Sequence, residues 1–205
     1  MSAPGRVARL FVGLAVPRAT AEELVRAFAS FEVVHAGWRC VPAEDLHVTL
    51  VFLGDVALDP SGPGLGELTA ALERHAASVA PTRVQLEHFG AFPSAAPGHA
   101  ARVLWAGPRR PAPELQALHR ASQAACAELG LVREPVAELA AWSPHVTLAR
   151  APRGRKARVP DGLDAHPLAL EFDAREFVLF ETVSPVPGAG RYRPIQRVPL
   201  NGTPA

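Results

Sequence analysis

The chain has 205 residues, of which 48% are hydrophobic, so it can bury a substantial core in one domain or two small lobes. Its 21 basic and 20 acidic residues leave a formal net charge of +1, which excludes a strong overall positive field for nucleic acid. Only Cys40 and Cys126 occur, without zinc-module or disulfide-framework spacing, and no apolar run approaches the roughly 18 residues of a membrane span. We therefore expect a soluble, cytoplasmic protein without membrane contact, in which any anion site is local.

Strands and helices alternate along the chain. The predicted helices, each with an apolar stripe at helical spacing, cover residues 18–31, 66–79 and 112–130. The predicted strands cover residues 8–16, 46–54, 82–92, 101–107, 143–150, 168–183 (one long strand or two short ones) and 188–200. This order suggests two lobes of similar construction that meet at a cleft. We expect residues 1–205 to form a single bilobal domain with short flexible termini.

The strand LHVTLVFLG (46–54) carries two polar residues that point the same way. Because successive side chains of a strand alternate between its faces, His47 and Thr49 project together from one face. The expected opposite, apolar face consists of Leu46, Val48, Leu50 and Phe52. A buried histidine with one hydrogen bond is common in protein cores, so this segment alone does not indicate a functional site.

The same pattern returns in SPHVTLAR (143–150), where His145 and Thr147 again share a face. A chain with this content of histidine and threonine contains by chance about 0.06 such segments. Two copies therefore indicate a function that uses both pairs.

Paired histidines suit acid–base chemistry. A metal site normally needs three or four ligands, and no Cys, Asp or Glu stands at ligand spacing from either histidine, so we expect neither a metal nor another cofactor. With a pKa near 6.5, one imidazole can accept a proton while its partner donates one. Each threonine hydroxyl can donate to a phosphoryl oxygen. The pattern therefore favours a reaction at phosphorus between two His-Thr units.

The two H-x-T motifs, the segment RLFVGLAVP (9–17) and the segment GAGRYRPI (188–195) resemble the two-histidine phosphoesterase superfamily, in particular its RNA 2',3'-cyclic phosphodiesterase (2'-5' RNA ligase) family. The resemblance implies an α+β, bilobal fold with a pseudo-two-fold axis. Each lobe would have an antiparallel sheet and helices, and would lend one His-Thr strand to a central cleft. The implied activity is metal-independent hydrolysis of RNA 2',3'-cyclic phosphate ends to 2'-phosphates. Ligation to a 2'-5' bond is also allowed, with a 5'-hydroxyl in place of water.

The resemblance also implies roles for individual residues. His47 would be the general acid on the leaving O3', and His145 the base that orients water, although the residues alone do not say which histidine is the acid. Thr49 and Thr147 would bind phosphoryl oxygens. Arg150 matches an arginine that follows the second motif and would bind phosphate, but strict alternation puts it on the wrong face unless the strand ends or bulges there.

Two further features have both a functional and a structural interpretation. Phe11, on the first strand, could stack on a base of the substrate or could belong to the core. The basic loop at residues 150–158 could bind RNA beyond the reacting group or could be a solvated loop. Tyr192 and the other histidines fit structural roles.

The sequence leaves three functions open. The first is the RNA 2',3'-cyclic phosphodiesterase, for which we expect a monomer acting on RNA with a cyclic phosphate end. The second is another two-histidine phosphoesterase, acting on 2'-5' oligonucleotides or cyclic nucleotide by-products. The third is a noncatalytic protein that binds RNA ends. Two complete H-x-T units argue against the third function.

Overall fold

The computed structural model describes residues 6–31, 37–58, 64–96, 98–132, 142–184 and 190–203. Residues 1–5 and 204–205, where flexible termini were expected, lie outside these ranges. So do His35, one of the histidines for which a structural role was expected, and the first residues of the strand predicted over 188–200.

The described residues form α-helices α1 (Arg18–Ala29), α2 (Leu65–Ala76) and α3 (Pro113–Ala127), and a short 3₁₀ helix η1 (Ala43–Asp45). The strands are β1 (Val7–Ala15), β2 (Arg39–Cys40), β3 (His47–Ala57), β4 (Thr82–Leu86), β5 (His88–Phe92), β6 (Ala100–Ala101), β7 (Val103–Gly107), β8 (Val146–Arg150), β9 (Ala157–Arg158), β10 (Leu170–Ala174), β11 (Glu176–Thr182) and β12 (Tyr192–Pro199). The predicted helices and the first His-Thr strand are confirmed. The second His-Thr strand begins at Val146, directly after His145, rather than at residue 143.

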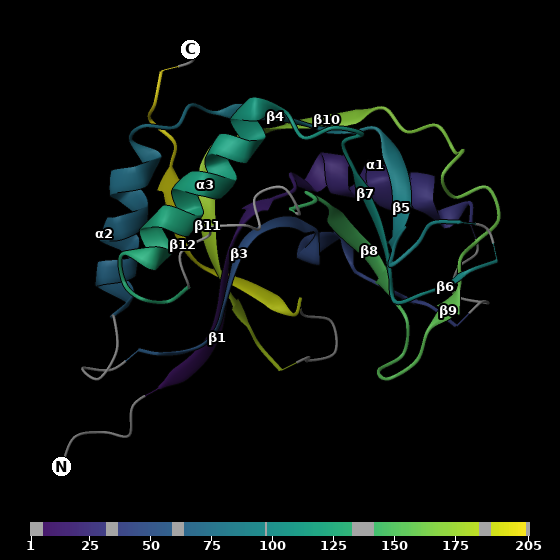
Figure 1. Ribbon diagram of the computed structural model, residues 1–205, viewed down its shortest axis with the longest axis horizontal. Coiled ribbons are helices and arrows are strands. Elements are labelled where there is room, and N and C mark those ends of the chain that lie inside the picture. Colours follow the sequence, from purple (N-terminus) through teal and green to yellow (C-terminus); the bar gives the residue numbers. More distant parts are fainter. Residues whose placement is uncertain are drawn as a thin grey trace.

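An eight-stranded antiparallel sheet in the order β12-β11-β1-β3-β8-β7-β5 forms the frame, with β2 also paired to β8. It divides at the β3–β8 contact, where Val48 and Val146 are partners. Figure 1 shows β1, β3, β11 and β12 with α2 and α3 on one side of this contact, and β5, β7 and β8 with α1 on the other. The predicted α+β fold with two lobes and antiparallel sheets is therefore confirmed.

The two lobes do not follow the order of the chain. Helix α1 comes from the first half of the sequence but covers the β5-β7-β8 lobe, where Phe28 contacts Phe89 of β5. Helix α3 follows β7 but packs against β3 and α2 in the other lobe. Each lobe thus depends on both halves of the chain, and neither half is expected to fold alone.

The prediction of a single strand over residues 82–92 is wrong. It divides into β4, which pairs with β10 in a separate two-stranded sheet, and β5, which joins the main sheet. The break falls at Glu87, whose backbone N–H donates to the Gly107 carbonyl (2.9 Å). The buried positions show the reason, since Val84 and Leu86 keep strand alternation but Phe89 lies out of phase with them.

The apolar face predicted for β3 also needs correction. Thr49 and Val51 pair with consecutive residues of β1, so that Leu50 between them forms a β-bulge. The bulge turns Phe52 away from the core, and its side chain is 70% exposed. Strict alternation holds from His47 to Leu50 and fails beyond it.

Candidate active site

The two His-Thr motifs meet where the lobes join. Val48 and Val146 are cross-strand partners and are both buried in the core. In an antiparallel pair the residues on either side of such partners point to the opposite face. His47 and Thr49 of one lobe therefore share a face with His145 and Thr147 of the other, as the sequence predicts.

His47 is held in one orientation by the short helix η1 before its strand and by a group of aromatic side chains. Its Nδ1–H donates to the backbone carbonyl of Asp45 (2.7 Å), since a carbonyl can only accept. The ring lies 4.7 Å from the ring of Phe11 and 4.8 Å, edge to face, from that of Tyr192. With the proton on Nδ1, the neutral imidazole keeps Nε2 free to accept another.

The carboxylate of Asp45 ties His47 to the C-terminal segment. Its two oxygens accept the backbone N–H groups of Arg191 (2.9 Å) and Tyr192 (3.0 Å). A Cβ at Gly190 would lie 2.7 Å from the Asp45 carboxylate, so any larger residue would have to displace this carboxylate. One residue thus places both the hydrogen-bond acceptor for His47 and the Tyr192 ring beside it.

His145 repeats the arrangement in the second lobe. Its Nδ1–H donates to the carbonyl of Ser143 (2.8 Å), also two residues upstream. Phe92 lies edge to face at 5.0 Å, and Trp105 stacks on Phe92 at 5.2 Å. Each lobe therefore offers an imidazole with a bonded Nδ1–H and an aromatic wall.

Arg150 reaches the same face because β8 bulges. Ala149 and Thr147 pair with consecutive residues of β7, leaving Leu148 without a partner. The extra residue reverses the alternation, and a guanidinium N–H of Arg150 lies 3.5 Å from the Thr147 hydroxyl oxygen. The bulge that Arg150 needs in order to reach the face of the two motifs is therefore present.

Burial and Arg150 together keep both imidazoles neutral. Burial, with a smaller contribution from the positive charge of Arg150, lowers the pKa of His47 to about 4. Burial and Arg150 lower the pKa of His145 as well. Without a bound anion, neither ring carries a proton on both nitrogens at neutral pH.

Phe11 is buried, as one of its two interpretations expects, whereas Phe52 is exposed although it was expected on the apolar face. Phe11 is 1% exposed and packs against His47 and Phe180, so the structure favours its packing interpretation. Phe52, its cross-strand partner, presents an exposed ring 5.8 Å away on the same face. The sequence missed both Phe52 and Asp45.

Other expectations concern the surroundings of the site. Arg153, Arg155 and Lys156 of the basic loop are exposed, and Arg158 pairs with Asp161. Two cavities, of about 290 and 430 Å³, are lined by residues that include neither motif histidine, so the central cleft stays a prediction. Within the described ranges, no three His, Cys, Asp or Glu side chains gather as metal ligands would.

Comparison with known proteins places this geometry in a family. The family described as the 2'-5' RNA ligase superfamily matches residues 16–184. An RNA 2',3'-cyclic phosphodiesterase of Geobacillus stearothermophilus is 35% identical over 168 residues, which cover 80% of this chain. They cover 48% of that relative, so the match spans about half of its length.

None of the helices in the described part of the chain has the length and apolarity that crossing a membrane requires.

Solved structures agree over nearly the whole chain. LigT of Escherichia coli in complex with 3'-AMP superposes with a TM-score of 0.68 and 26% identity, covering 95% of this chain and 99% of that one. A protein of Thermus thermophilus superposes with a TM-score of 0.66 and 28% identity, covering 95% and 98%.

Proposed function

Since the chain belongs to the 2'-5' RNA ligase superfamily, we propose that it hydrolyses RNA 2',3'-cyclic phosphate ends to 2'-phosphates without a metal ion. One observation carries the proposal. Two imidazoles from different lobes, each with its Nδ1–H bonded to a carbonyl two residues upstream, share a face with two threonines and an arginine. This arrangement supports proton transfer on both sides of a phosphorus atom.

The proposed reaction is a single displacement. His145 Nε2 takes a proton from water as the water oxygen bonds to phosphorus. The bond from phosphorus to O3' breaks, and His47 gives the proton on its Nε2 to that oxygen. Thr49 and Thr147 donate to phosphoryl oxygens, and Arg150 offsets the negative charge that develops on them. A 5'-hydroxyl that replaces water would give ligation with the same groups.

The low pKa of His47 sets a condition on this mechanism. A general acid must be protonated, yet at a pKa of about 4 the free protein holds His47 neutral at pH 7. An anionic phosphate beside the ring raises the pKa, because opposite charges favour the charged form. Binding of the substrate therefore favours the protonated form of His47 that a general acid needs. The rate should depend on pH as a bell, and because the two histidines interact, its two apparent pKa values belong to the pair and not to either residue.

Phe52 supplies a surface for a nucleobase. Its ring is exposed on the face that carries His47, and single-stranded nucleic acid binds largely by stacking of bases on aromatic side chains. In this proposal Phe52 takes the substrate-binding role that the sequence suggested for Phe11.

The names of the relatives support this choice. The Geobacillus relative is an RNA 2',3'-cyclic phosphodiesterase, and the Escherichia coli structure holds a mononucleotide. Another two-histidine phosphoesterase activity would use the same residues, and a noncatalytic binder would need only the phosphate contacts.

The test is an assay of EDTA-treated protein with an oligoribonucleotide that ends in a 2',3'-cyclic phosphate and, separately, with a 2'-5' linked dinucleotide. Turnover of the first substrate well above the second supports the proposal. Faster cleavage of the dinucleotide would favour the alternative enzyme, and tight binding without turnover would favour the binder.

A further inference from the structure

Arg39 stands directly opposite Arg150. The two residues are cross-strand partners in the β2–β8 ladder, so their side chains leave the sheet on the same face with Cβ atoms about 5 Å apart. Arg150 is the residue whose guanidinium lies at the Thr147 hydroxyl. Arg39 therefore belongs to the same face of the molecule as the two His-Thr motifs.

Strand β2 is firmly held in this place. Trp38 is buried, and its indole N–H donates to the carbonyl of Arg158 (3.0 Å). On the other side of Arg39, the N–H of Val41 donates to the carbonyl of Leu148 (2.8 Å). The backbone of Arg39 is thus anchored to both β8 and the end of the basic loop.

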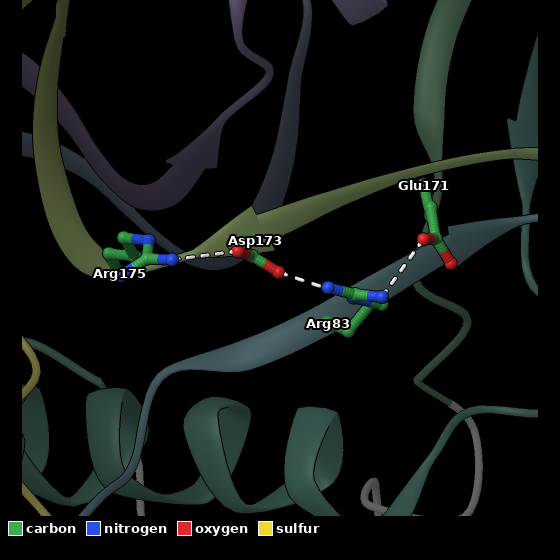
Figure 2. A network of polar contacts seen from close by, with 4 residues as sticks. All are labelled: Arg83, Glu171, Asp173 and Arg175. Carbon is green, nitrogen blue, oxygen red and sulfur yellow. Dashed lines mark hydrogen bonds and ion pairs between the residues drawn. The ribbon is translucent and has the colours of Figure 1, made fainter.

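The charges of this pair have no acidic partner in the described part of the chain. Among the described residues, neither Arg39 nor Arg150 forms an ion pair with a carboxylate. The β4–β10 sheet offers the contrast: Figure 2 shows Arg83 between Glu171 and Asp173, with Asp173 as its cross-strand partner. Like charges directly opposite one another destabilise a sheet, which favours an anion at the Arg39–Arg150 pair.

The position of Arg39 separates its role from that of Arg150. Strand β8 pairs with β3 at Val146, beside the motifs, and with β2 at its other end. Arg150 lies near enough to lower the pKa of both histidines, whereas Arg39 lies across the strand at the start of the basic loop. We therefore expect an anion bound by Arg39 to be a second group, adjacent to the reacting phosphate that Arg150 binds.

We propose that Arg39 binds the phosphate on the 5' side of the terminal nucleotide while Arg150 binds the reacting phosphate, so that the site recognises a polynucleotide end. This inference rests on the proposed function. It assigns the uncompensated pair to two successive phosphates of one RNA strand, with the 5' direction leading toward the basic loop.

Binding measurements test the inference without catalysis. The probes are a nucleoside 2'-monophosphate and the matching nucleoside 2',5'-bisphosphate, which differ by one phosphate, and the method is calorimetric titration. We expect the wild type to bind the bisphosphate about tenfold more tightly, the scale of a charge-assisted hydrogen bond. Arg39→Gln should reduce this ratio toward one, and Arg39→Lys should keep most of it. Arg26→Gln, on the exposed side of α1, is the matched control and should leave the ratio unchanged.

Turnover gives the second readout. With a nucleoside 2',3'-cyclic phosphate and its 5'-phosphorylated form, Arg39→Gln should lose the KM advantage of the 5'-phosphate with little change in kcat. An unchanged ratio, or equal weakening of both ligands, would overturn the inference. Failure of the wild type to hydrolyse either cyclic phosphate would instead contradict the proposed function, and the binding ratio would still decide the role of Arg39.

Discussion

The two histidines have the same type of hydrogen bond and the same type of aromatic surroundings, supplied by different residues. Each imidazole donates from Nδ1 to a carbonyl two residues upstream, and each is flanked by aromatic rings from other strands. The expected result is loss of turnover by at least about 10²-fold in both His47→Ala and His145→Ala, the usual scale for an acid or base. Initial rates on a cyclic-phosphate oligonucleotide measure it. His75→Ala, which changes a half-buried histidine paired with Glu128 outside the site, is the control, and wild-type rates in either active-site variant would rule out the assignment.

Asp45 acts on His47 through the backbone. In Asp45→Ala two backbone N–H groups lose their acceptor, which costs roughly 1–3 kcal/mol for each group that stays buried. Because the Tyr192 ring then loses its fixed place beside His47, we expect kcat to fall more than KM rises. Asp45→Asn keeps one acceptor oxygen and should recover part of kcat. Steady-state kinetics with thermal unfolding would separate the effects, and a loss of stability at unchanged kcat would refute the positioning role.

Phe52 and Phe11 form a matched pair with opposite exposure. Phe52→Ala should leave the stability within about 0.5 kcal/mol, since the ring is 70% exposed, but should raise KM for oligonucleotides by roughly tenfold through lost stacking. Phe11→Ala empties a buried site beside His47 and should cost about 3–5 kcal/mol of unfolding free energy. Urea unfolding and KM values check both. An unaltered KM in Phe52→Ala would exclude the stacking role.

At the scale of elements, β-bulges decide which side chains reach the site. The alternation of polar and apolar residues around β3 and β8 can be recognised in the sequence, and it correctly groups His47 with Thr49 and His145 with Thr147. The bulges at Leu50 and Leu148 bring Phe52 and Arg150 to that face, and they arise from the registers with β1 and β7. A register between distant strands leaves no local pattern, so the sequence could state the condition for Arg150 but could not predict Phe52.

Helix α3 supports the second motif through an aromatic stack. His119 is buried, and its ring lies parallel to that of Trp142 at 4.1 Å, three residues before His145. Burial lowers the pKa of His119 to about 4 from its ordinary value of 6.5, so between these pH values the unfolded chain binds more protons than the folded one. The free energy of unfolding must then fall as the pH falls through this window.

His119→Phe keeps a ring against Trp142 but cannot be protonated. We expect the variant to lose less unfolding free energy than the wild type between pH 7 and pH 5. His47, His145 and His88, whose pKa values are also lowered by burial, contribute to the remaining dependence in both proteins. Denaturant unfolding at the two pH values measures the difference. Equal pH dependence in both proteins would show that His119 is not buried in its neutral form.

At the scale of the whole molecule, the fold joins the strands of the two lobes in one sheet at the β3–β8 pair and places the chemistry there. The doubled motif identified this junction from the sequence, because each copy lies within one short strand. The connections of Asp45 could not be predicted, since its partners Arg191 and Tyr192 come from the far end of the chain. The exchange of α1 and α3 between the lobes was equally hidden, because the apolar stripe of a helix does not indicate which sheet it covers.

The central claim is that histidines from the two lobes act on opposite sides of one phosphorus atom, with His47 at O3'. The most direct measurement is phosphorus NMR of the product formed in EDTA from an oligoribonucleotide with a 2',3'-cyclic phosphate end. In-line attack with a fixed acid opens only one of the two ester bonds, so the account predicts a 2'-phosphate with a free 3'-hydroxyl. A 3'-phosphate, or an equal mixture of both products, would contradict it.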